Sequence, residues 1–165
     1  MADRDEFTAQ EWTLLRVTPS FVSVGVSAAD ASGLYSAVKE AIAGSHEVIL
    51  TLTANSHLEL FSALAADRSL PDLPDVDRLV GDGSNQQRLD NFKSAALEHV
   101  SAAVALVVNK ASGAEAEAYR KLLIRVAERA ANASKEGGFL GFGGVRVSDK
   151  ERTFISLVSA AAGVE

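Results

Sequence analysis

The sequence predicts an all-α fold, a single domain of five to seven helices arranged in two halves. A Ser or Thr followed three residues later by Glu, the capping box that marks a helix start, occurs four times. Apolar residues after these boxes recur at the i, i+3, i+4 and i+7 spacing of one helix face. A chain of 165 residues with 47% hydrophobic residues can also bury one sizeable core. Residues 1–165 are therefore expected to form one helical domain.

The first helix is expected to begin at the Thr8–Glu11 capping box. Phe7 and Trp12 flank this box at the spacing of a hydrophobic staple. Pro19 has no backbone N–H and its ring clashes with the preceding turn. We expect Pro19 to interrupt this helix or to open a second one.

Three segments follow before the first proline-containing stretch. Residues 34–42 carry apolar side chains at helical spacing, with Gly44 placed as a C-terminal cap. Residues 48–53 are short and rich in β-branched side chains, so strand and helix both remain open. The Ser56–Glu59 capping box predicts a helix that extends to about Asp67.

Residues 69–85 contain two prolines, two glycines and four aspartates, and are expected to form a surface connection between the two halves. Calcium is one interpretation, because hard cations prefer several carboxylates from one loop. The EF-hand spacing is not matched, since the sixth position counted from Asp75 is Val80 rather than glycine. A solvated acidic loop is preferred. Its aspartates are Asp72, Asp75, Asp77 and Asp82.

Residues 89–108 are expected to form the central helix, with Ser84 or Asn85 as its cap and an end near Asn109. Ala102–Val108 is apolar without interruption. A helix that is apolar on all sides must be enclosed by other elements, so the remaining helices are expected to wrap this one.

Two more helices are predicted after the central one. The Ser112–Glu115 capping box opens a helix with apolar residues on one face and charged residues on the other. The Ser148–Glu151 box opens the last helix. The apolar face of the former is expected to hold Tyr119, Leu122, Leu123, Val126, Ala127, Ala130 and Ala131, and that of the latter Phe154, Leu157, Val158 and Ala161.

An α/β fold remains the alternative, with strands at residues 21–26, 48–53, 103–108 and 145–147. The apolar run after Ala102 favours the helical interpretation, because it continues the helical spacing that begins at Leu89.

The residue types available for chemistry are few. The chain has three histidines and no cysteine, which excludes disulfides and leaves few nucleophile and base pairs. Motifs for di-iron, zinc-protease, serine-hydrolase and phosphate-loop sites do not occur in the sequence. His99, in the central helix, is expected to be a hydrogen-bonded histidine in the core or at its boundary. No catalytic residue is predicted, and we expect a protein that is not an enzyme.

The net charge of −6 argues against nucleic acid as the main partner, because phosphate binding needs clustered Lys and Arg. The apolar runs are shorter than the roughly 18 residues that cross a bilayer, and the first residues lack the apolar region of a signal peptide. We therefore expect a cytoplasmic protein without a membrane span.

Residues 137–147 form the most unusual stretch, with five glycines among residues 137–144. The glycines do not match a dinucleotide-binding fingerprint. Burial of each large apolar side chain here is worth about 1.5 to 3 kcal/mol, so we expect these side chains to be covered. The cover is the helical bundle itself, a partner or second copy, or a small molecule or lipid. The candidate partner-binding residues are Phe139, Leu140, Phe142 and Arg146, the last of which can bind an anionic group.

Two passages resemble each other and the repeated helical unit of the TerB-like tellurite-resistance domains. They are Val22–Asp30, with its Ala-Ala-Asp turn, and Leu123–Asn132 followed by Ser148–Glu151. The resemblance implies an all-helical fold of two packed halves. It also implies a divalent cation at the acidic turns.

That metal site is incomplete in this sequence. Asp30 keeps the acid of the first turn, but serines stand where the next acids are expected, and Asn132 occupies the second turn. Any remaining cation site is reduced to Asp30 with Asp149 or Glu151. No other cofactor is expected.

The sequence thus predicts a non-enzymatic interaction or scaffolding module, which the resemblance suggests is bacterial and related to stress. Its partner is expected to be a protein or a second copy, bound through residues 137–147. The alternative is a sensor of divalent metal or a small ligand that uses Asp30 and the acidic connection.

Overall fold

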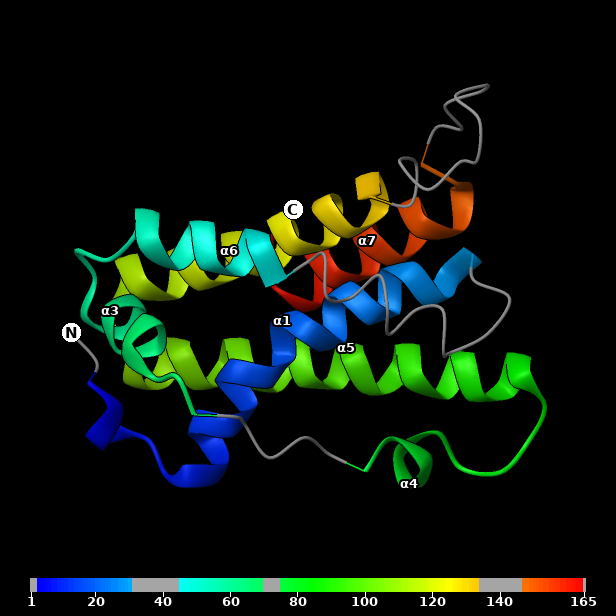
Figure 1. Ribbon diagram of the computed structural model, residues 1–165, viewed down its shortest axis with the longest axis horizontal. Helices are drawn as coiled ribbons and strands as arrows, with labels where there is room; N and C mark the ends of the chain where they lie inside the picture. The colour runs from blue at the N-terminus through cyan, green and yellow to red at the C-terminus, as the bar shows by residue number, and fades with distance from the viewer. Residues whose placement is uncertain (1–2, 31–44, 70–74, 134–146, 165) are drawn as a thin grey trace.

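The computed structural model describes residues 3–30, 45–69, 75–133 and 147–164 (Figure 1). Every regular element within these ranges is a helix, which confirms the all-α prediction. The α/β alternative is wrong at 21–26, 48–53 and 103–108, which are helical, while residues 145 and 146 lie outside the described ranges. The elements are the 3-10 helix η1 (Arg4–Glu6), α1 (Ala9–Asp30), a helix over residues 45–54, α3 (Glu59–Ala66), α4 (Val76–Val80), α5 (Asn85–Lys110), α6 (Gly113–Ala133) and α7 (Asp149–Ala161).

Helix α1 is the element that the others surround. It packs against α5, α6 and α7, and lies between α5 and the α6–α7 pair in Figure 1. Its buried side chains include Trp12, Leu15 and Val22, and the Phe21 ring stacks on Phe92 of α5 at 5.3 Å between ring centroids. The first helix of the chain therefore supplies much of the core.

Helix α5 is less enclosed than the apolar run Ala102–Val108 predicts. Ala102 and Ala105 are exposed, and Val108 is 49% exposed, whereas Val104 and Val107 are buried against the core. The expectation of a helix buried on all sides is therefore wrong. Alanine accounts for the difference, because it favours helix on an exposed face as well as on a buried one.

Pro19 does not interrupt α1, contrary to the expectation from sequence; the helix continues from Ala9 to Asp30. A proline at this position leaves the Leu15 carbonyl without its usual helical donor. The hydroxyl of Tyr119 on α6 donates to that carbonyl at 2.7 Å. Figure 1 shows α1 changing direction along its length, as expected for a helix that contains proline.

Three of the four predicted capping boxes are present. Thr8 and Glu11 exchange hydrogen bonds of 2.8 and 3.2 Å, and the boxes opened by Ser112 and Ser148 are closed in the same way. Ser84 caps α5 together with Gln87. These caps explain why the helix starts are readable from sequence.

The box predicted at Ser56 is wrong, because α3 begins only at Glu59. The Ser56 N–H instead donates to the Thr53 carbonyl at 3.2 Å, in the turn that follows the 45–54 helix. The start of α3 is capped from α6: the Leu60 N–H donates to the fully buried carboxylate of Glu115 at 3.0 Å. The other oxygen of Glu115 accepts from Ser112, so one carboxylate caps two helices.

The acidic connection 69–85 contains the short helix α4, which the sequence did not predict; residues 70–74 lie outside the described ranges. Asp75 caps α4, and Val80 at its end is fully buried. Asp77 pairs with Arg88 of α5 at 2.7 Å. This part of the connection is therefore packed on α5 rather than solvated throughout.

The last two helices bury the predicted faces except at Leu157 and at Ala161, which is only partly buried. All seven apolar residues predicted for α6 are buried, and Phe154 and Val158 of α7 are buried too. Leu157, predicted on the same face, is 47% exposed. The Phe154 ring lies against Gly25 of α1, where a Cβ would be only 2.5 Å from the ring.

Asp67, directly after α3, fixes that end of the fold to α1. It accepts hydrogen bonds from the Trp12 indole at 2.8 Å and the Ser69 hydroxyl at 2.6 Å, and it pairs with Arg16 at 3.2 Å.

In the described ranges, no helix is long and apolar enough to cross a membrane.

Candidate functional site

The residues predicted to bind a partner are Phe139, Leu140, Phe142 and Arg146, and all four lie outside the described residues. Their role as a contact surface stays a prediction.

Of the three predicted metal ligands, the structure describes the side chains of Asp149 and Glu151, and the site as a whole stays a prediction. Asp30 ends α1, but its side chain lies outside the description. Asp149 is exposed and pairs with Arg152 on its own helix. Glu151 is 3% exposed and accepts from the Ser148 N–H at 2.8 Å as part of the α7 cap. Searching the described residues finds no group of three or more His, Asp or Glu that could hold a metal ion.

The buried polar side chains described above serve the fold. Glu115 and Glu151 cap helices, and Tyr119 supplies the donor that Pro19 lacks. His99 stacks on Phe21 with 4.3 Å between ring centroids, and its Nδ1 lies 2.8 Å from the Ala95 carbonyl oxygen. The sequence-based interpretation of His99 as a hydrogen-bonded boundary histidine is confirmed.

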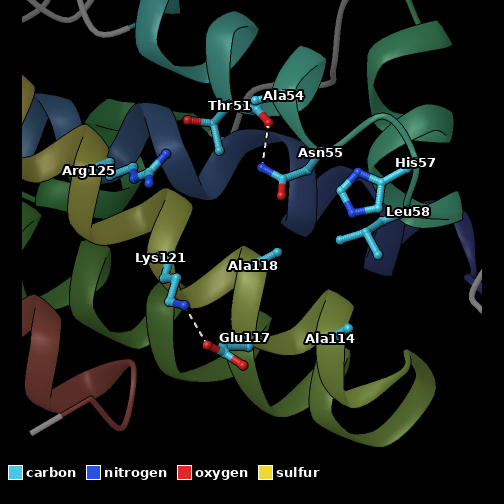
Figure 2. A pocket seen from close by; sticks show the side chains of 10 residues that line it. All are labelled: Thr51, Ala54, Asn55, His57, Leu58, Ala114, Glu117, Ala118, Lys121 and Arg125. Carbon is cyan, nitrogen blue, oxygen red and sulfur yellow. Dashed lines mark hydrogen bonds and ion pairs between the residues drawn. The ribbon is translucent and has the colours of Figure 1, made fainter.

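An open groove of about 380 Å³ lies between the 45–54 helix and α6 (Figure 2). One wall comes from that helix and the turn after it, and the other from the first half of α6. We call it the α6 groove. It is lined by Thr51, Ala54, Asn55, His57, Leu58, Ala114, Glu117, Ala118, Lys121 and Arg125.

Local sequence explains the shape of the α6 groove. Ala114 and Ala118 are one turn apart on α6, and their small side chains leave space beside the opposite wall. Glu117, Lys121 and Arg125 follow each other at four-residue spacing, so they share one face of the helix. The groove is therefore apolar along one line of α6 and charged along the next.

The opposite wall ends in a fixed turn. The Thr51 carbonyl, near the end of the 45–54 helix, accepts from both the backbone N–H of Asn55 at 3.1 Å and its side-chain amide at 2.8 Å. His57 and Leu58 follow this turn and lie at one end of the α6 groove, whereas Arg125 lies at the other (Figure 2).

The charges in the α6 groove are only partly paired. Lys121 forms an ion pair with Glu117, and its hydrogen bond lowers the pKa of the Glu117 carboxyl. Arg125 is exposed and forms no ion pair with the described part of the chain, and His57 is exposed as well. Two cations and a histidine thus accompany one carboxylate, in a chain whose net charge is −6.

Exposed apolar side chains lie beside the α6 groove. Leu50 is 50% exposed and stands one turn before Ala54 of the groove wall, so it extends that wall outward. Ile49, its neighbour, is 61% exposed. These are the two most exposed large hydrophobic residues in the described ranges.

A second pocket of about 220 Å³ lies beside Pro19, between α1, the 45–54 helix, α3 and α6. Its lining is mainly apolar, and the charged pair at its edge, Arg16 and Asp67, is already satisfied internally. This pocket follows from the irregularity of α1 and offers no free polar group of that pair to a ligand.

Sequence reasoning missed the α6 groove, because its two walls come from segments far apart in the chain. A signal in the sequence was the charged face predicted for the helix that follows the Ser112–Glu115 capping box, which includes Lys121 and Arg125. Comparison of the chain with protein-family models, with curated proteins and with solved structures gave no match.

Proposed function

We propose that this chain is a non-enzymatic helical interaction module whose contact surface is the α6 groove with Leu50 at its edge. The observation that carries the proposal is the juxtaposition of Arg125, which no described carboxylate pairs, with exposed apolar side chains on the facing helix. Arginine and large apolar residues are the types that dominate binding energy at protein interfaces.

The character of the α6 groove supports a macromolecular partner. It is open along one side, so a segment of a partner chain can lie in it without rearrangement of the two walls. The buried polar groups described above are already engaged in helix caps and backbone hydrogen bonds, whereas Arg125 and His57 of the groove are exposed.

The test is affinity capture from an extract of the native cell, followed by mass spectrometry. Two baits are compared: the wild-type protein and the double variant Leu50→Asp, Arg125→Glu. The matched control is Arg129→Glu, which reverses an exposed charge on the same helix outside the groove lining. We expect wild type and control to recover the same partner, and the double variant to lose it. Equal recovery by all three would overturn the proposal.

Residues 137–147 remain the second candidate surface for contact with a partner. A Phe139→Asp, Phe142→Asp variant belongs in the same experiment. Loss of the partner with this variant alone, with the α6 groove variants unaffected, would move the contact surface to the loop.

A further inference from the structure

We propose that the α6 groove recognises an acidic segment of a partner protein, in which carboxylates flank one apolar side chain. This inference rests on the proposed function and names the class of partner. It follows from the charges, the apolar walls and one internal ion pair of the groove.

The α6 groove differs in charge from the chain as a whole. The chain carries net charge −6, yet Lys121 and Arg125 line the groove together with His57, against Glu117 alone. A guanidinium binds carboxylates through two parallel hydrogen bonds, and Arg125 is not engaged by a described carboxylate. An acidic segment therefore meets complementary charge at the groove.

The apolar walls define the second requirement. Leu58 and Ala114 lie at the end of the α6 groove opposite Arg125, with Ala118 between the two ends (Figure 2). On the 45–54 helix, Ala54 lines the groove and the half-exposed Leu50 stands one turn before it. A leucine-sized side chain placed there removes apolar surface from water on both partners. Acidic residues alone would leave these walls exposed.

The Glu117–Lys121 pair gives the inference a distinctive signature. Figure 2 shows Lys121 directed along α6 to Glu117, so an incoming carboxylate must compete with Glu117 for this ammonium group. Both side chains are more than half exposed, so the pair is weakly held and can be exchanged. Removal of the Glu117 charge should therefore strengthen binding.

The test uses a phage-displayed library of random peptides, selected on the full-length wild-type protein. We expect enriched peptides that contain several Asp or Glu residues around a Leu, Ile or Phe. Binding of a synthetic, fluorescein-labelled copy is then measured by anisotropy. Reversal of Arg125 to Glu should weaken it at least about fivefold, while Arg129→Glu should change it less than about twofold.

The decisive variant is Glu117→Gln, for which we expect binding tighter by about two- to fivefold, a gain that loss of folding cannot produce. Enrichment of peptides without acidic residues, or an unchanged or weaker affinity with Glu117→Gln, would overturn the inference. If the library yields no acidic peptides but the groove variants still lose the native partner, the partner segment is not acidic, and the proposed function of the groove as a contact surface stands. Equal capture of the native partner by every groove variant would overturn both.

Discussion

The hydroxyl of Tyr119 takes the place of the backbone N–H that Pro19 lacks, and this replacement can be tested by mutation. Tyr119 is fully buried, and its burial raises the pKa of the hydroxyl, so the group stays a donor to the Leu15 carbonyl. In Tyr119→Phe this buried carbonyl loses its donor, and we expect the free energy of unfolding to fall by about 1 to 3 kcal/mol. Urea denaturation monitored by circular dichroism measures the change.

The control for that prediction is the Pro19→Ala background. An alanine at position 19 supplies the amide that donates to Leu15 in an ordinary helix. There Tyr119→Phe should cost less than about 1 kcal/mol, because the carbonyl then has a second donor. An equal cost in both backgrounds would show that the hydroxyl does not serve this carbonyl.

Asp67 should make stability depend on pH in the acid range. Hydrogen bonds from the Ser69 hydroxyl and the Trp12 indole lower the pKa of Asp67 from 3.8 to about 2. The unfolded chain therefore binds this proton first, and the stabilisation, present above a pH of about 4, is lost as the pH falls through about 2.

The comparison that isolates this effect is wild type against Asp67→Asn, with urea midpoints measured from neutral to acidic pH. We expect the variant to be less stable near neutral pH and the difference to shrink as the pH falls below about 4. A difference that is constant over this range would assign the effect to other carboxylates.

At the scale of helices, the contact between α1 and α7 depends on the absence of a side chain at Gly25. The Phe154 ring occupies the space of a Cβ at that position, with its Cζ atom 2.5 Å away. Gly25→Ala should therefore lower the free energy of unfolding by about 1 to 3 kcal/mol, despite the better helix propensity of alanine.

A second substitution tests whether the ring is the cause. In a Phe154→Leu background the shorter side chain leaves room for the methyl group, so Gly25→Ala should cost clearly less than in wild type. Additive costs in a thermal or urea denaturation series would place the strain elsewhere.

Helix starts were predictable where the cap is local in sequence. Thr8, Ser112 and Ser148 each meet a glutamate three residues on, and the short reach makes the hydrogen bonds independent of the rest of the fold. Ser56 has the same pattern, but it lies in the turn that follows the 45–54 helix. The cap of α3 comes instead from Glu115 of α6. A cap supplied by a distant segment leaves no signal at the helix that it serves.

The buried faces were predictable to the same degree. The apolar spacing of α6 identified its core residues, whereas Leu157 and Val108 are apolar and exposed. The spacing of apolar residues shows which side of a helix faces the core, but not how much of that side the neighbouring helices cover. The extent of cover depends on packing between segments, which a single sequence does not specify.

At the scale of the whole molecule, the α6 groove could not be predicted, because it exists only once the 45–54 helix has docked beside α6. The residues that we expected to bind a partner, Phe139, Leu140 and Phe142, lie outside the described ranges, and none of the groove residues was predicted to bind.

The cap that α6 provides for α3 also sets the order in which these helices form during folding. Helix α3 spans only 8 residues, a length at which an isolated helix is marginal in water, and its first turn depends on Glu115. On the ribosome, α3 emerges well before that carboxylate is held in place by α6. Helix α3 should therefore remain unformed until α5 and α6 have been made and have docked, so the last part of the N-terminal half to fold waits on the C-terminal half.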